Sequence, residues 1–232
     1  MSEGSQPSEP KDEVHINITP LNPDGSIHIE KGNVPFYNVE GPIARRMIDL
    51  QLHKVDLMLV AECLRLLTHK HVTHTIESEA IWIAAMVRFF KCFSGTDGGR
   101  SQLSHRRVLK AEPPEAMVSF ARLETLRNKT LVHDQNSFMQ GKLGVPIEFP
   151  PNASPRMGPL VFVSFVATTL DDESVSNLTL LTQCTLKWIE VEYAKLESRV
   201  VADLRKEKAA TIVARGVVTW TSPSHETAGQ TK

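Results

Sequence analysis

The residues of this sequence best suited to chemistry lie in the stretch Arg-Asn-Lys-Thr-Leu-Val-His-Asp at positions 127–134. An imidazole such as that of His133 has an ordinary pKa of about 6.5 and can move a proton at neutral pH. The planar guanidinium of Arg127 can donate two hydrogen bonds to a phosphate and stabilise charge developing on phosphorus. Asn128 can orient this pair, and Lys129 adds attraction for an anion. These side chains are suited to holding a phosphate and moving a proton beside it, and this requires no metal and no cofactor.

Arg127 lies where a charge needs an explanation. A helix is predicted over about residues 115–132, and its apolar residues form one stripe at the helical period: Ala116, Phe120, Leu123 and Leu131. Arg127 falls inside this stripe. A buried guanidinium must be paired or line a cleft, because burying it unpaired costs several kcal/mol. The alternative is that Arg127 pairs with a buried acid and His133 caps the helix end.

One straight helix does not bring the two side chains together. Six residues separate Arg127 from His133, which corresponds to about 120° of rotation and roughly 9 Å along the axis. They converge if the helix ends between them, or if two protomers each contribute one Arg and one His to a shared cleft.

This layout resembles the HEPN superfamily, in which an Arg, usually followed by a polar residue, precedes a His near a helix end in a small helical bundle. Arg127, Asn128 and His133 match, with five residues between Arg and His. An Arg followed by a His after four to six intervening residues also occurs at Arg46–His53, Arg65–His71 and Arg100–His105, so the motif is distinguished by its context. The resemblance covers seven motif residues and a helical context of about residues 42–208.

The resemblance implies a metal-independent endoribonuclease with a composite site at a homodimer interface, in a toxin–antitoxin, phage-defence or stress-response system. The expected location is cytoplasmic, because no secretory signal is visible. RNA or a nucleotide and a protein partner such as an antitoxin are the implied partners. The open alternatives are a noncatalytic helical module that binds a nucleotide or a protein through the same cleft, and a helical scaffold without a ligand.

Further substrate contacts are assigned to Lys129 and Asp134 in the motif, and to Arg88 and Lys91. The last two open the one clearly basic stretch, residues 88–110, with six Lys or Arg against one acid. This stretch is either a solvated loop or a rim that contacts phosphate.

Other candidates are weaker. His69, His71 and His74 are spaced like metal ligands, but no Cys joins them, and solvated loop histidines are favoured. Phosphate-loop, nucleophile-elbow and His-Glu-x-x-His motifs are absent from the sequence. The three cysteines are odd in number and far apart, so they are expected to be reduced core residues.

The elements that position these residues are predicted to form a mainly α fold: a four- to five-helix up-and-down bundle with a β-hairpin insertion, about residues 141–169, before the long last helix. The first helix, about 42–68, is expected to bury one face made of Ile48, Leu52, Val55, Leu59, Cys63 and Leu66. The second is expected to begin at the N-cap Ser78 and to be central, because it is apolar nearly all round.

Two further helices complete the bundle besides the one that carries the motif. Residues 100–109 are expected to form a short helix, and residues 171–208 a long one capped near Ser174 or Ser176. The long helix is expected to bury Leu178, Leu181, Ile189, Tyr193, Leu196, Val200 and Leu204.

The sequence predicts one helical domain over residues 38–208, between an N-terminal tail (1–37) and a C-terminal tail (209–232). The N-terminal tail is expected to be flexible, with a possible β-hairpin around the turn Asn-Pro-Asp-Gly at 22–25. The 26 basic against 27 acidic residues provide no global field toward nucleic acid or lipid. The most apolar run, 80–87, is too short to cross a membrane, and no secretory signal is visible. No membrane association is predicted.

Overall fold

A computed structural model of the chain describes residues 26–29, 32–69, 75–95, 100–132, 139–149, 154, 156–166 and 169–218. The chain divides into two compact units. One consists of the residues up to Ala44 together with those from Arg199 onward, and the other of Arg45–Ser198. Within the described residues, no helix is both long enough and apolar enough to cross a membrane.

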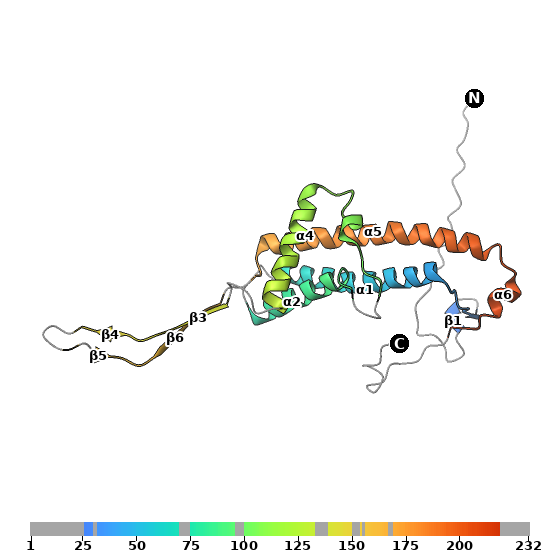
Figure 1. Cartoon of the computed structure of the whole chain (residues 1–232). Helices are drawn as coiled ribbons and strands as arrows, with labels where there is room; N and C mark the ends of the chain where they lie inside the picture. Colours follow the sequence, from blue (N-terminus) through green and yellow to red (C-terminus); the bar gives the residue numbers. More distant parts are fainter. Residues whose placement is uncertain are drawn as a thin grey trace, which may run out of the picture. The chain divides into compact units, whose positions relative to one another are not determined.

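The larger unit is built from helices, and the predicted mainly α fold with a β-insertion before the long last helix is confirmed. Its helices are α1 (Pro42–His69), α2 (Ile76–Lys91), α3 (His105–Val108), α4 (Pro114–Leu126), the π-helical turn η1 (Arg127–Val132) and α5 (Asp172–Leu204), of which α1 and α5 extend into the smaller unit. Figure 1 shows α5 running alongside α1, where Lys54 forms an ion pair with Glu190 at 3.0 Å.

The core of this unit is centred on α2 and α4. Trp82, Met86, Phe89 and Phe90 of α2 are almost fully buried, as the sequence predicts. Phe120 of α4 lies against Phe89, Phe90 and the neighbouring Phe93, with ring centroids 5.0–6.2 Å apart. Such tilted and edge-to-face contacts are favourable beyond the area they bury.

The helix predicted over 42–68 is confirmed as α1, but the face predicted to be buried is wrong. Cys63 is half-buried, and the other five residues of that face are exposed: Ile48, Leu52, Val55, Leu59 and Leu66. The buried side of α1 instead carries Leu50, Leu57, Val60, Leu64 and Leu67. Both stripes have helical spacing, so periodicity predicts the helix without saying which stripe meets the core.

Helix starts also differ from the prediction. The N-cap of α2 is Thr75 rather than Ser78, and its hydroxyl accepts a hydrogen bond from the backbone N–H of Ser78 at 3.2 Å. At α5, Asp171 accepts from the backbone N–H of Ser174 at 2.7 Å and so acts as the cap that was assigned to Ser174 or Ser176. Both are side-chain acceptors for an N3 amide, the usual N-cap arrangement.

The predicted β-insertion is confirmed within the described residues. β3 (Met139–Gly144) pairs antiparallel with β6 (Val161–Val166), and β4 (Ile147–Glu148) with β5 (Arg156–Met157). The side chains described between Lys142 and Phe149 are all exposed.

The smaller unit contains a hairpin and a short helix. β1 (Ser26–Ile29) pairs with β2 (Gly32–Pro35), so the paired strands lie after the predicted turn at 22–25, which is outside the described residues. Residues 209–232 were predicted as a tail, but α6 (Ala209–Val213) forms there. A β-bridge joins Tyr37 to Val217, because the chain after α6 returns to the segment that follows β2.

Candidate functional site

Arg127 lies at the junction between α4 and η1. Its backbone N–H donates to the carbonyls of Leu123 and Glu124, and the π-helical turn begins at the same residue. The helix predicted over about residues 115–132 therefore changes its winding at Arg127. Single π-helical turns are frequent at functional sites.

The guanidinium of Arg127 contacts the C-terminal end of α2. Its Nη2 donates a hydrogen bond to Oγ of Ser94 at 3.2 Å, and its Cζ lies 5.4 Å from the centroid of the Phe90 ring. The Ser94 hydroxyl in turn donates to the carbonyl oxygen of Phe90 at 2.9 Å. An aromatic ring stabilises a cation by about 0.5–2 kcal/mol. The guanidinium is thus held in place without being neutralised.

The charge of Arg127 has no carboxylate partner in the part of the chain that the structure describes, where all ion pairs involve other basic residues. Its Nε is buried and finds no hydrogen-bond acceptor there. The alternative of pairing with a buried acid is therefore wrong for the described residues. A buried donor without a partner costs about 1–3 kcal/mol, so an incoming anion would be favoured at this position.

The rest of the motif is only partly described. Asn128 and Lys129 are exposed on η1. His133 and Asp134 lie outside the described residues, so the approach of His133 to Arg127 stays a prediction.

The structure brings Arg88 and Lys91 to Asp56 rather than to Arg127. Asp56 of α1 is almost fully buried and receives three cations: Arg100 at 2.7 Å, Arg88 at 3.3 Å and Lys91 at 3.6 Å. Burial opposes ionisation of this carboxyl, but the hydrogen bond and charge of Arg100, helped by Lys91, outweigh burial and lower the pKa of Asp56. The three cations carry more charge than one carboxylate neutralises.

A buried polar face of α1 was missed by the sequence reasoning. Asp49, His53 and Asp56 are all buried, at spacings of four and three residues that place them on one side of the helix. The available signal was that Asp49 and Asp56 directly precede Leu50 and Leu57, which lie in the core. Because the opposite stripe was predicted to be buried, no role was predicted for these polar residues.

This face fastens the segment after α2 to α1 through Ser101. Asp49 accepts hydrogen bonds from the backbone N–H and the hydroxyl of Ser101, at 3.1 and 2.5 Å. Arg46 donates to the same hydroxyl at 2.7 Å, and Nε2 of His53 lies 3.0 Å from the carbonyl oxygen of Ser101. His53 thus meets the carbonyl and not the hydroxyl, so these residues do not form a Ser-His-Asp nucleophile. Their arrangement positions a loop.

The thiols are not activated nucleophiles. Burial raises the pKa of all three, that of Cys92 to about 12. A thiol reacts as the thiolate, which these environments disfavour. The cysteines are free, in agreement with the prediction of reduced residues.

His53 is expected to make the stability of the protein depend on pH. Burial lowers its pKa, and the charges of Arg100 and Arg46 act in the same direction, against the hydrogen bond to Ser101 and the charge of Asp49. Because the pKa in the unfolded chain is higher, the unfolded chain binds the proton more readily. The contribution of neutral His53 to the stability of the fold is therefore complete above about pH 6.5 and is lost as the pH falls below that value.

Urea unfolding at about pH 7.5 and about pH 5.5 measures this loss of stability. His53→Gln is the matched variant, because its amide can donate to the Ser101 carbonyl but does not titrate. The parent is expected to lose more stability between the two pH values than the variant does. Equal losses would contradict the assignment to His53.

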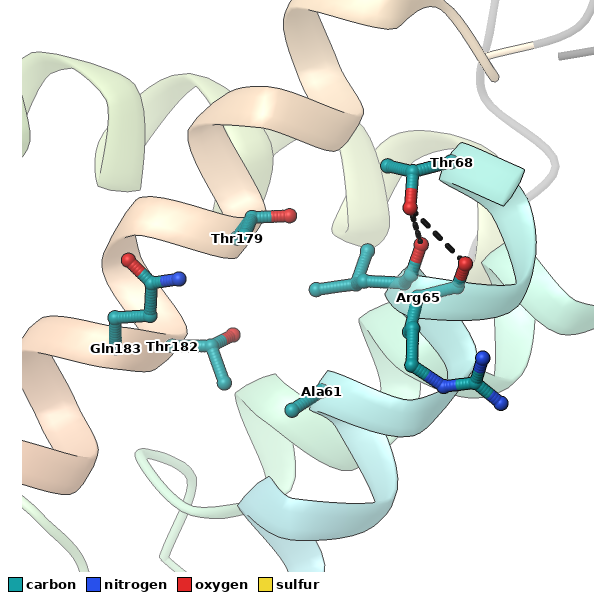
Figure 2. A pocket seen from close by; sticks show the side chains of 7 residues that line it. Ala61, Arg65, Thr68, Thr179, Thr182 and Gln183 are labelled. Carbon is teal, nitrogen blue, oxygen red and sulfur yellow. Dashed lines mark hydrogen bonds between the residues drawn. The ribbon is translucent and has the colours of Figure 1, made fainter. Parts of the chain in front are cut away.

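A hollow of about 250 Å³ lies between α1 and α5, lined by Ala61, Leu64, Arg65, Thr68, Thr179, Thr182 and Gln183 (Figure 2). The three threonine hydroxyls donate to carbonyls of their own helices, and the Arg65 guanidinium points away from the hollow and binds Glu62. Ligand sites usually offer convergent polar groups in about 300–1,000 Å³. This hollow is smaller and offers few such groups, so we assign it no function.

Among the described residues, no group of three or more His, Cys, Asp or Glu is placed to hold a metal ion. The side chains of His69, His71 and His74 lie outside the described residues. Comparisons with protein-family models, with curated proteins and with solved structures find no match to this chain. Function is therefore inferred from the residues of the site.

Proposed function

We propose that this chain is a HEPN-like, metal-independent endoribonuclease in which Arg127 binds the phosphate of an RNA chain. The observation that carries the proposal is the guanidinium of Arg127, held by Ser94 and the Phe90 ring and without a carboxylate partner among the described residues. Its planar fork matches two phosphate oxygens, and bringing a phosphate to it would compensate the charge. The π-helical turn at Arg127 adds support.

In the proposed reaction, the ribose 2′-oxygen attacks phosphorus while the bond from phosphorus to the 5′-oxygen breaks. The 2′-hydroxyl gives its proton to an imidazole, and the departing 5′-oxygen takes a proton from an imidazolium. The products are a 2′,3′-cyclic phosphate and a 5′-hydroxyl. His133 is assigned this proton transfer from the sequence, and Arg127 stabilises the charge on the non-bridging oxygens.

The remaining predicted residues have supporting roles in this proposal. Asn128 orients the catalytic pair, and Lys129, Asp134, Arg88 and Lys91 contact the substrate. A homodimer in the cytoplasm, with one Arg and one His from each copy in a shared cleft, completes the site. A toxin–antitoxin or phage-defence role, with an antitoxin as protein partner, follows from the same resemblance.

Cleavage of mixed RNA in the presence of EDTA tests the proposal. The parent is expected to produce 2′,3′-cyclic ends, and Arg127→Ala and His133→Ala are expected to abolish them. Arg122→Ala is the matched control, because Arg122 is exposed on the same helix and pairs with Glu173. No cleavage by the parent, or undiminished cleavage by the two variants, rejects the nuclease. RNA binding without cleavage supports the noncatalytic module instead.

A further inference from the structure

An apolar stripe on α1 is exposed in the single chain. Its side chains are between 37% and 57% exposed and follow one another at steps of four, three, four and seven residues: Ile48, Leu52, Val55, Leu59 and Leu66. Alternating steps of three and four are the spacing of a helix that packs along another helix. This is the stripe whose periodicity predicts burial, and nothing in the described part of the chain covers it.

A second exposed stripe lies on α2. Ile76, Ile83 and Val87 are between 42% and 87% exposed, and their spacing of seven and four residues continues the same periodicity. The opposite side of α2 carries the buried Trp82 and Phe89. α2 is therefore apolar on two sides, but the bundle uses only one of them.

The two stripes lie on the same side of the α1–α2 pair. The seam between these helices is marked by Asp56 and Arg88, whose side chains meet at 3.3 Å. Successive residues of a helix are turned by about 100°. On α1 the exposed stripe therefore lies on one side of Asp56 and the buried stripe on the other, and on α2 the two stripes lie on either side of Arg88 in the same way. Because both helices face the same core, both exposed stripes lie on the side away from it. We call these eight residues the outer α1–α2 face.

The outer α1–α2 face is larger than a monomer usually leaves uncovered. Its exposed apolar side chains amount to on the order of 700 Å², whereas contiguous patches on monomers rarely exceed about 300–600 Å². A standard protein interface buries about 800 Å² on each partner. The face is therefore within the usual range for one side of a standard interface, about 600–1,000 Å².

We propose that a second copy of this chain covers the outer α1–α2 face, so that two α1–α2 pairs pack together as an intermolecular four-helix arrangement. The eight residues of the face carry no charge, and the cations Arg88 and Lys91 near the seam are paired with Asp56. A second copy supplies the same paired stripes, related by a two-fold axis, and its net charge of −1 adds little repulsion. The proposed contact between the two copies does not depend on the RNA cleavage proposed above.

Val55→Lys tests this proposal, with sedimentation equilibrium as the measurement. Val55 is 56% exposed at the middle of the face, and Val118 of α4, 68% exposed, provides the same substitution away from it. The parent and Val118→Lys are expected to be dimers with a roughly micromolar or tighter dissociation constant. Val55→Lys is expected to weaken the dimer at least about 30-fold, because it buries a charge at the centre of the interface.

A second variant, Ile83→Lys, repeats the test from α2, and thermal melts monitored by circular dichroism confirm that each variant is folded. A monomeric parent at about 100 µM overturns the proposal, as does a Val55→Lys dimer as tight as the parent. Sedimentation is measured without RNA, so its result is independent of the cleavage assay. A dimer that does not cleave RNA in that separate assay refutes only the nuclease. A cleaving monomer refutes the interface and the sharing of the site between two copies, but not the cleavage itself.

Discussion

Replacing Phe120 with alanine is expected to lower the free energy of unfolding by about 3–5 kcal/mol. The Phe120 side chain is 2% exposed. Its ring centroid lies 5.3 Å from that of Phe90 and 5.0 Å from that of Phe93, and it stacks on the His105 ring with centroids 4.9 Å apart. Removing it leaves a cavity among rings that cannot all move to fill it. Urea unfolding monitored by circular dichroism measures the loss.

The exposed Val118 lies on the same helix and provides the control. Val118→Ala is expected to change the free energy of unfolding by at most about 0.5 kcal/mol. A loss below about 1 kcal/mol for Phe120→Ala would show that the aromatic cluster is not the centre of the core. Because the ring of Phe90 contacts both Phe120 and Arg127, Phe120→Ala is also expected to loosen the proposed phosphate site.

Arg127→Lys is expected to slow RNA cleavage about 10²–10³-fold while leaving the melting temperature nearly unchanged. Lysine keeps the positive charge but presents a point charge instead of a planar fork, so it cannot bind two phosphate oxygens while also donating to Ser94. The rate of cleavage of a defined RNA, measured in EDTA, tests this expectation.

Arg122→Lys is the matched control for this substitution, since Arg122 is exposed and its partner is Glu173. Its cleavage rate is expected to stay within about twofold of the parent, because an exposed ion pair contributes little. If Arg127→Lys also cleaves at nearly the parental rate, the guanidinium fork has no role in the reaction and only its charge matters.

The positions of the helices were predictable because each one repeats its apolar residues at the helical period. α1, α2, α4 and α5 all lie where the sequence predicts them, and the β-insertion stands before α5. Helix caps were less predictable, since several hydroxyl and carboxylate side chains near the start of each helix can accept a hydrogen bond from the same backbone N–H. Thr75 and Asp171 took that role from nearby serines.

The candidate site was predictable only in part. Arg127 was identified because a charge on an apolar stripe conflicts with burial, but its contacts with Ser94 and Phe90 depend on how α4 crosses the end of α2. The buried Asp49, His53 and Asp56 were missed for a similar reason. Ser101 and Arg100, which satisfy them, come from a segment about fifty residues further along the chain.

The sequence by itself determined that this chain forms amphipathic helices, which residues on them are apolar, and where an arginine interrupts an apolar stripe. Tertiary structure alone decided which of the two apolar sides of α1 meets the core and which faces solvent. The physical reason is that periodicity reports a tendency to be buried, whereas the partner that buries a stripe is set by packing. That partner is α2, α4 or α5 for one side and, in our proposal, a second copy for the other.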